Sequence, residues 1–219
     1  LKDILDFCWN DGSLYLVTSQ GLFESRIVRK TEGKHDFVLC LLNPEPVVRG
    51  KIAHLCSDGK TNLYFSVNQR KVVHHDLVAK KTSLIKEYSV VNRLFLRYGY
   101  LWICRLWDDF ICYYLKTNEE RVISMEGKDQ SEFSNSYVTD LVLKDNRTFY
   151  LTTWNGLYKL RFDNDNLCKS PFVLTLLTKN EKAFHSSIEN KMTSLFWDDK
   201  QQILWVGTFG GGVVKFDIS

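Results

Sequence analysis

The sequence repeats one pattern five times, and this repetition constrains the fold more than any other feature. Each copy opens with an apolar residue, places Leu or Phe three positions later, and carries an aromatic residue eight to ten positions after that. The copies start at Ile4, Ile52, Val91, Val138 and Met192, and the aromatic residues are Tyr15, Tyr64, Trp102, Tyr150 and Trp205. Self-similarity at a period of roughly 40–55 residues indicates an array of equivalent structural units.

Each copy predicts three consecutive antiparallel strands joined by tight turns. The opening apolar run forms the first strand, the segment with the aromatic residue forms the second, and a third follows the next turn. A further apolar run after each of the first four copies predicts a fourth strand; these runs are 37–42, 83–88, 121–125 and 172–177. Four antiparallel strands in a unit of this length make the blade of a β-propeller. The predicted fold class is therefore all-β, a β-propeller of four-stranded antiparallel blades with five repeats.

The fifth copy differs from the others because only Ile218 and Ser219 follow Asp217. We therefore expect no fourth strand there, and the residues before Ile4 are too few to supply one. A propeller closes its ring to remove exposed strand edges. Residues 1–219 are thus expected to form a single partial β-propeller domain, with the ring completed by chain beyond this sequence.

Composition argues against several classes of partner. The 219 residues carry a formal net charge of +3, and Lys and Arg are scattered rather than clustered, so neither a nucleic-acid surface nor a membrane surface is expected. No run reaches the ~18 apolar residues that a membrane helix needs. The six cysteines lack the spacing of a metal site, and we expect no metal and no cofactor.

Two clusters of reactive side chains have simple structural interpretations. Cys104 and Cys112 flank a predicted hairpin and could pair in a disulfide, although two separate thiols are favoured. His74 and His75 are adjacent in a predicted strand, where neighbouring side chains point to opposite faces of the sheet. The two histidines are therefore expected to diverge, and we assign them no metal or catalytic role.

Three copies share a motif at the turn that leads into the third strand. A Thr is followed three positions later by a Gly, and the pairs are Thr18 and Gly21, Thr153 and Gly156, and Thr208 and Gly211. We expect each Thr to hydrogen-bond the neighbouring backbone and each Gly to permit a tight connection. Trp102 and Trp205 are expected to pack between blades, since a large aromatic side chain buries much apolar area.

The fifth copy resembles a known repeat. Its segments Leu204-Trp-Val-Gly-Thr208 and Gly210-Gly-Gly-Val-Val-Lys-Phe-Asp217 are similar to the two-component-regulator propeller repeat, in which L-W-I-G-T is followed by G-G-L-x-R-Y-D. The fourth copy, from Thr153 to Asp163, and the first, from Thr18 to Phe23, match less completely. The second and third copies keep only the apolar frame and the aromatic residue.

This resemblance implies the ligand-sensing, periplasmic region of a hybrid two-component sensor histidine kinase in the inner membrane. In that family two propellers precede a β-sandwich, a membrane helix and a kinase. The region would recognise an oligosaccharide, regulate glycan-utilisation genes and catalyse nothing itself. Its partners would be the oligosaccharide, the remaining blades or a second propeller of the same polypeptide, and a second copy that dimerises through downstream domains.

The predicted ligand site lies at the rim formed by two kinds of loop, those that lead into the first strands and those that join the second and third strands. Departures from the repeat at this rim are informative, because local rules tend to fail where function intervenes. A sugar site needs aromatic faces and planar polar groups. The candidate ligand-binding residues are Arg70, Trp107, Asp108, Trp154 and Asn155. The structural alternative is that these side chains pack against neighbouring blades of an eroded repeat.

Two other functions stay open. A propeller hydrolase or lyase acting on polysaccharide would need an acid and a base converging on one site, and no carboxylate pair recurs on one set of strands. A protein-interaction scaffold of the WD type would carry Gly-His openings and Trp-Asp strand ends, which this sequence lacks.

Overall fold

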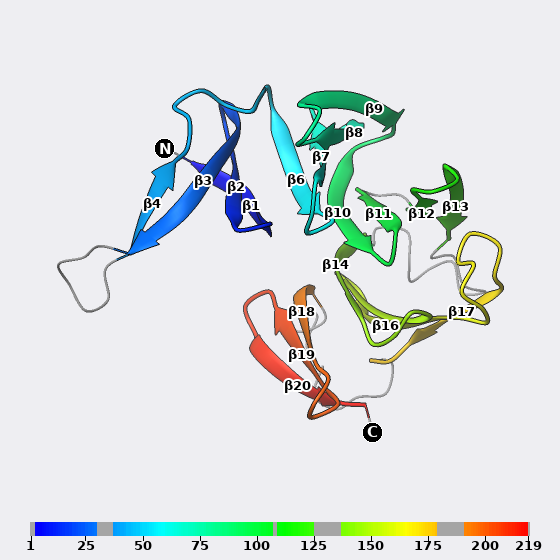
Figure 1. The fold of residues 1–219 in the computed structure, drawn as a ribbon. Coiled ribbons are helices and arrows are strands. Elements are labelled where there is room, and N and C mark those ends of the chain that lie inside the picture. Colours follow the sequence, from blue (N-terminus) through cyan, green and yellow to red (C-terminus); the bar gives the residue numbers. More distant parts are fainter. Residues whose placement is uncertain (1–2, 30–36, 107–108, 125–136, 179–190, 219) are drawn as a thin grey trace. The chain divides into compact units, whose positions relative to one another are not determined.

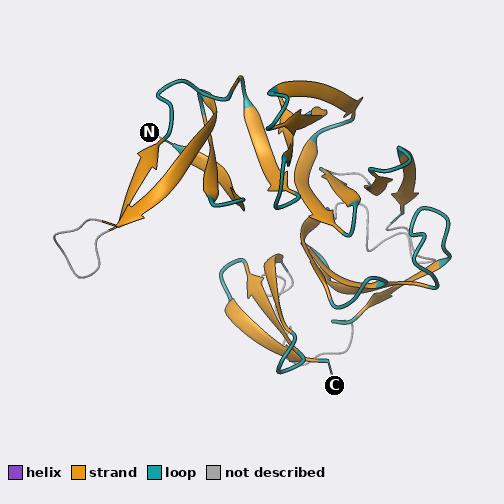
Figure 2. Cartoon of the chain, viewed as in Figure 1, coloured by secondary structure: helices purple, strands orange, loops and turns teal. Residues whose placement is uncertain are grey.

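The computed structural model describes residues 3–29, 37–106, 109–124, 137–178 and 191–218. These residues form five antiparallel sheets joined by loops, and the described part of the chain contains no helix (Figures 1 and 2). Accordingly, no described helix is long and apolar enough to cross a membrane.

Each sheet corresponds to one copy of the repeat and is called a blade here. Blade 1 contains β1 (Ile4–Asn10), β2 (Ser13–Thr18), β3 (Gly21–Arg29) and β4 (Phe37–Leu41), with β5 (Val48–Arg49) also pairing β3. Blade 2 contains β6 (Ile52–Ser57), β7 (Asn62–Val67), β8 (Lys71–Asp76) and β9 (Lys81–Glu87). Blade 3 contains β10 (Val91–Arg97), β11 (Tyr100–Arg105), β12 (Phe110–Tyr114) and β13 (Glu119–Ile123). Blade 4 contains β14 (Val138–Leu143), β15 (Thr148–Thr153), β16 (Gly156–Phe162) and β17 (Phe172–Leu176). Blade 5 contains β18 (Met192–Asp198), β19 (Ile203–Thr208) and β20 (Gly212–Asp217).

The predicted fold class is confirmed. Strands in every blade follow one another in sequence order as an antiparallel meander, which is the topology of a propeller blade. The four predicted outer strands are present as β4, β9, β13 and β17. Blade 5 has three strands among its described residues, as expected.

The hairpin turns follow from residues that tolerate a left-handed backbone. Asp11 and Gly12 have φ of 43° and 76° between β1 and β2, and Tyr98 and Gly99 have φ of 50° and 77° between β10 and β11. Positive φ at both central residues is the mark of the two-residue turn whose twist matches the twist of the flanking strands. These turns fix the register that places alternate side chains on opposite faces of each blade.

The chain divides into two compact units, Leu1–Leu96 and Arg97–Ser219. In the first unit, apolar side chains of blades 1 and 2 form one core. Its members are Tyr15, Val17, Leu22, Ile52, Leu55, Leu63, Phe65 and Val73. The aromatic residue of copy one therefore fills the space between two blades rather than a ligand site.

In the second unit, Trp102 of β11 packs against blade 4. Its ring centroid lies 4.7 Å from that of Phe149 and 6.2 Å from that of Phe162, and the side chain is fully buried. The predicted packing of Trp102 between blades is thus confirmed. Trp205 differs, because it is 36% exposed on the face of blade 5 that also carries Phe196.

Neighbouring blades are also joined by hydrogen bonds between their first strands. The Asp6 carboxylate accepts the Leu55 backbone N–H at 2.8 Å, and the Asp140 carboxylate accepts the Leu195 N–H at 2.7 Å. Both aspartates occupy the third position of their copy, next to a register shift in the strand pairing. The sequence analysis missed this contact, although the recurrence of Asp within an apolar run was a usable signal.

Candidate functional site

The loops that form the predicted rim come together in the second unit. Trp154 and Asn155 form the turn between β15 and β16, and Phe209 lies in the turn between β19 and β20. Tyr137 directly precedes β14, and Lys191 directly precedes β18. These are the two kinds of loop in which a ligand site was predicted. We call Tyr137, Trp154, Lys191 and Phe209 the aromatic rim cluster.

The turn of blade 4 is held by its threonine, as predicted. The Thr153 hydroxyl donates to the Gly156 carbonyl at 3.2 Å and accepts the Asn155 N–H at 3.0 Å. Gly156 has φ of 142°, and a Cβ there would stand 2.5 Å from the Thr178 hydroxyl oxygen. Thr18 and Gly21 form the same turn in blade 1, where Thr18 bonds the Gly21 carbonyl at 3.3 Å. The turn therefore presents Trp154 and Asn155 at a fixed place on the rim.

The turn of blade 5 is one residue longer than predicted. Thr208 pairs with Gly212 and donates to its carbonyl at 3.0 Å, so the partner is not Gly211. Gly210 and Gly212 both adopt positive φ, 89° and 81°, which a side chain would disfavour. This glycine-rich turn leaves Phe209 59% exposed.

The members of the aromatic rim cluster surround Trp154. Its ring centroid lies 5.7 Å from that of Tyr137 and 6.3 Å from that of Phe209, and the Trp154 and Phe209 rings are within 26° of parallel. The Lys191 ammonium stands 5.2 Å from the Trp154 centroid, at cation–π distance. Phe209 N–H donates to the Lys191 carbonyl at 2.8 Å, which ties the two loops of blade 5 together.

Polar contacts further orient the cluster. Burial raises the pKa of Tyr137, and a side-chain hydrogen bond from Trp154 partly offsets that rise. The Tyr137 phenol is therefore neutral at physiological pH. Trp154 is half-buried with neighbours around its ring, so the apolar surface offered to a ligand is chiefly that of Phe209. The Lys191 ammonium, which stands over the Trp154 ring, and the exposed Asn155 amide are polar groups carried by the same rim loops.

The predicted site residues fall into three groups. Trp154 and Asn155 lie on the rim with Tyr137, Lys191 and Phe209, which sequence analysis missed. A signal for Phe209 existed, since an aromatic residue directly follows the turn Thr in both copies four and five. Trp107 and Asp108 lie outside the described residues. Arg70 belongs to the first unit, whereas Trp154 belongs to the second.

Arg70 closes the turn between β7 and β8. Its guanidinium Nε lies 3.5 Å from a carboxylate oxygen of Glu87, and both side chains are largely exposed. The turn is fixed by backbone hydrogen bonds, since the Gln69 carbonyl accepts Val91 N–H at 2.7 Å and the Arg70 carbonyl accepts Tyr88 N–H at 2.9 Å. Copy two thus replaces the Thr and Gly motif by a turn braced from neighbouring segments.

The adjacent histidines diverge, as predicted. His74 Nε2 lies 2.6 Å from the Asn62 amide oxygen, and the His74 ring stacks on Tyr64. His75 is buried on the other face, with Nδ1 2.8 Å from the Thr82 hydroxyl. Within the described residues no group of three or more His, Cys, Asp or Glu side chains is placed to hold a metal ion.

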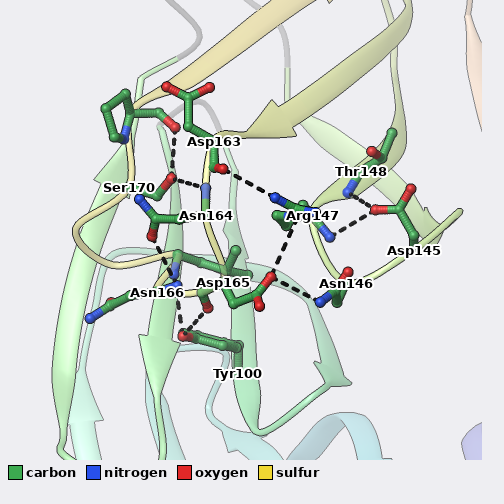
Figure 3. A network of polar contacts seen from close by, with 12 residues as sticks. Tyr100, Asp145, Asn146, Arg147, Thr148, Asp163, Asn164, Asp165, Asn166 and Ser170 are labelled. Carbon is green, nitrogen blue, oxygen red and sulfur yellow. Dashed lines mark hydrogen bonds and ion pairs between the residues drawn. The ribbon is translucent and has the colours of Figure 1, made fainter.

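A polar network in the second unit has a structural role (Figure 3). It holds the loop 163–171, which joins β16 to β17 and which we call the docking loop. Asp165 accepts from Asn146 Nδ2 at 2.9 Å and pairs with Arg147 Nε at 3.4 Å, while Ser170 Oγ accepts Asn164 N–H at 2.9 Å. The carboxylate, amide and hydroxyl groups are thus bonded to one another, and the network braces the loop.

Comparisons with known proteins support the fold. Neither a family model nor a curated protein shows significant sequence similarity to this chain. Among solved structures, the extracellular domain of BT4673 from B. thetaiotaomicron, described both as a putative one-component and as a putative hybrid two-component system, matches 98% of this chain with a TM-score of 0.65 and 17% identity. This chain covers 27% of that domain.

Two other structures are similar to a comparable degree. PorZ, a surface component of the type-IX secretion system of Porphyromonas gingivalis, matches 98% of this chain and 32% of its own with a TM-score of 0.63 and 11% identity. The β-propeller domain of Cps50 (Swd1) from Myceliophteria thermophila matches 99% of this chain and 66% of its own with a TM-score of 0.61 and 14% identity. At these identities the likeness shows the β-propeller fold alone.

Proposed function

We propose that this chain is a ligand-sensing, extracytoplasmic propeller region of a membrane-bound sensor histidine kinase, and that its ligand is an oligosaccharide. The observation that carries the proposal is the aromatic rim cluster, in which an exposed Phe209 stacks beside Trp154. The motifs of copies one, four and five, and the likeness to the extracellular domain of BT4673, support the sensor class.

The chemistry of the rim fits a sugar better than a purely apolar ligand. The C–H faces of a pyranose pack on aromatic rings, and its hydroxyls need donors and acceptors in the same plane. Phe209 offers the ring, while Lys191, beside Trp154, and Asn155 offer donors in the same rim loops. The braced turns keep these groups in place, which lowers the entropy that binding would otherwise cost.

The proposed function also concerns further residues, the cellular location and the partners of the protein. Arg70, Trp107 and Asp108 remain proposed ligand-binding residues. The protein would reside in the periplasm, attached to the inner membrane, and would regulate glycan-utilisation genes without catalysing a reaction. Its other partners would be further blades or a second propeller of the same polypeptide, and a second copy that dimerises through downstream domains.

The deciding experiment is calorimetric titration of the protein with a panel of plant and host oligosaccharides. We expect saturable binding to one class of glycan, with the ligand recovered intact. Phe209→Ala combined with Trp154→Ala should weaken the affinity at least tenfold, since each lost aromatic contact contributes about 1 kcal/mol. Phe196→Ala is the matched control, because Phe196 is 64% exposed on β18 but belongs to no rim loop.

The outcomes separate the open alternatives. Ligand recovered in shorter pieces would support a polysaccharide hydrolase or lyase instead. Failure of every glycan to bind would overturn the oligosaccharide sensor and leave a protein-interaction scaffold as the better interpretation. Equal loss of affinity in the rim variant and in the Phe196 control would contradict the assignment of the site.

A further inference from the structure

Two cysteines from different blades meet in the second unit. Cys112 is fully buried in β12 of blade 3, and Cys168 is half-buried in the docking loop of blade 4. Cys168 Sγ lies 3.7 Å from the carbonyl oxygen of Cys112 and 3.5 Å from that of Glu119. Cys112 lies opposite Arg121 in the pairing of β12 with β13, and the Arg121 guanidinium donates to the Leu167 carbonyl at 3.4 Å, so the docking loop covers the face of β12 that carries the Cys112 side chain. The Cys168 sulfur and the Cys112 side chain therefore meet across the boundary between two blades.

The docking loop is anchored to blade 3 on both sides of Cys168. Just before it, Leu167 N–H donates to the Tyr100 hydroxyl at 3.2 Å, and that hydroxyl donates to the Asp165 carbonyl at 3.1 Å (Figure 3). Just after it, Lys169 Nζ pairs with a Glu119 carboxylate oxygen at 2.6 Å. These contacts hold Cys168 against β12, so the position of its thiol is fixed by the anchored docking loop.

The cysteine pair suggested by the sequence has a less suitable geometry. Cys112 lies opposite Trp102 in the pairing of β11 with β12, which places Cys104 two positions further along the strand. Two positions along a strand span roughly 6.6 Å, and the strands themselves lie about 5 Å apart. The distance between the Cα atoms of Cys104 and Cys112 therefore exceeds the ~7 Å that a disulfide tolerates. A disulfide between Cys104 and Cys112 is therefore ruled out by the register.

We propose that Cys112 and Cys168 are a site of oxidative cross-linking, at which a disulfide joins blade 3 to blade 4. The oxidant is a disulfide, either of a thiol–disulfide oxidoreductase or of oxidised glutathione. The Cys168 thiolate attacks one sulfur of the oxidant, forms a mixed disulfide and releases one thiolate. The Cys112 thiolate then attacks Cys168 Sγ and displaces the second thiolate. Two protons leave the cysteines, and the two electrons reduce the disulfide of the oxidant to two thiols.

The environment of the pair sets the rate of this reaction. Burial raises the pKa of both thiols, and the proximity of each to the other contributes to the rise for Cys112. Since the thiolate is the nucleophile, formation of the cross-link should accelerate roughly tenfold per pH unit between about pH 7 and 9. The half-buried Cys168 is the more accessible thiol for the first attack.

The test uses the full chain with Cys40→Ser, which removes an exposed thiol that would otherwise link two molecules. The reduced protein is incubated with oxidised glutathione and digested without reduction. We expect one product in which the peptides of Cys112 and Cys168 are joined and the mass has fallen by about 2 Da. The cross-link should raise Tm by about 5–10 °C relative to the reduced protein, because it constrains the unfolded chain.

Two variants separate the cross-link from a structural effect of losing a thiol. Cys168→Ser should abolish the difference in Tm between oxidising and reducing conditions, whereas Cys104→Ser should retain it. Cys112→Ser leaves Cys168 with no resolving thiol, so its mixed disulfide with glutathione should persist, and this readout does not depend on the stability of either variant. The proposal is wrong if Cys104 is found in the cross-linked product, or if the wild-type pair stops at a glutathione adduct or stays reduced.

Discussion

Copies one and four close the turn between their second and third strands with a threonine and a glycine, whereas copy two uses three polar residues. Thr153 bonds the Gly156 carbonyl from within the turn. In copy two, Asn68 and Gln69 adopt positive φ of 53° and 56° without the help of glycine, and the turn accepts backbone hydrogen bonds from residues outside it. The turn of copy four is thus held by its own threonine side chain, and that of copy two by backbone hydrogen bonds, which include one within the turn from Arg70 N–H to the Val67 carbonyl at 3.2 Å.

The junctions between blades show the same contrast. At the third position of copies one and four, an aspartate accepts an N–H from the first strand of the next blade. Copy two has His54 there, with φ of 56°. Its half-buried imidazole interacts with the backbone of Val91, the first residue of the next blade's first strand. A repeat can therefore keep its architecture while exchanging a carboxylate acceptor for an imidazole, provided that each still joins the neighbouring strand.

The largest effect should come from the two glycines that share one backbone conformation. Gly21 and Gly156 both have φ of 142°, but a Cβ at Gly21 would collide with the Val48 carbonyl, while one at Gly156 would meet the side chains of Thr178 and Leu176. Backbone atoms cannot yield as side chains can. We expect Gly21→Ala to destabilise the fold by about 3–5 kcal/mol and Gly156→Ala by about 1–3 kcal/mol, measured by urea unfolding.

This pair tests whether the two regular copies are equivalent. If Gly156→Ala costs as much as Gly21→Ala, the backbone strain shared by both sites dominates and the local neighbours do not matter. Gly12→Ala serves as a reference, because Gly12 has positive φ of 76° but no atom within 4 Å of its added Cβ.

A smaller effect is expected at the aspartate junction. Asp140→Ala removes the acceptor for Leu195 N–H and leaves that donor without its partner at the boundary between blades 4 and 5. We expect a loss of about 1–3 kcal/mol in the free energy of unfolding. Asp198→Ala is the control, since Asp198 bonds only the exposed turn residue Gln201 among the contacts described for it, and its loss should be near 0.5 kcal/mol. Similar losses for the two variants would argue against a special role for the junction.

The histidine junction should instead depend on pH. Burial lowers the pKa of His54, so the folded protein holds this imidazole neutral where the unfolded chain would bind a proton. Its contribution to stability is thus complete above the unfolded pKa near 6.5 and is lost as pH falls toward the lower folded pKa. Unfolding measured from pH 8 to pH 5 should show a slope of at most about 1.4 kcal/mol per pH unit from this group.

His54→Gln should flatten that slope while His75 remains as an internal reference. Burial also lowers the pKa of His75, which contributes in the same direction. A pH slope unchanged by His54→Gln would contradict the protonation argument and leave His75 as the group that titrates.

The sequence predicted the blades because the features that define them are local. Apolar periodicity and turn residues located the first three strands of every copy and the fourth strand of copies one to four, and Thr153 with Gly156 predicted the turn that carries Trp154. The site was predicted only in part. Lys191 and Tyr137 enter the aromatic rim cluster through contacts between loops that are distant in sequence, and no spacing rule links them to Trp154.

Copy two also shows why the repeat pattern alone could mislead. Asn68 and Gln69 both adopt positive φ, a conformation that the sequence would suggest for glycine or asparagine but not for glutamine. The hydrogen bond from Val91 N–H to the Gln69 carbonyl, which supports this turn, comes from the following copy and so could not be read from copy two alone. Cys112 and Cys168 belong to different blades, so their contact could not be predicted from the strand pattern. The sequence instead suggested Cys104 as the partner of Cys112, because these two cysteines flank one predicted hairpin.

The smallest effect is expected where copy two is made to resemble the regular turns. Gln69→Gly would relieve a side chain held at φ of 56° while keeping the carbonyl that accepts Val91 N–H. A left-handed conformation costs a residue with a Cβ about 1 kcal/mol, and the greater freedom of glycine in the unfolded chain offsets roughly half of that gain. We therefore expect the variant to be more stable by about 0.5 kcal/mol in urea unfolding. Lys80→Gly, at φ of 51° in the turn before β9, is the matched control and should gain as much. A loss of stability in Gln69→Gly alone would mean that the glutamine side chain itself stabilises the turn of copy two. Its side chain would then help to fix the turn that carries Arg70, a proposed ligand-binding residue.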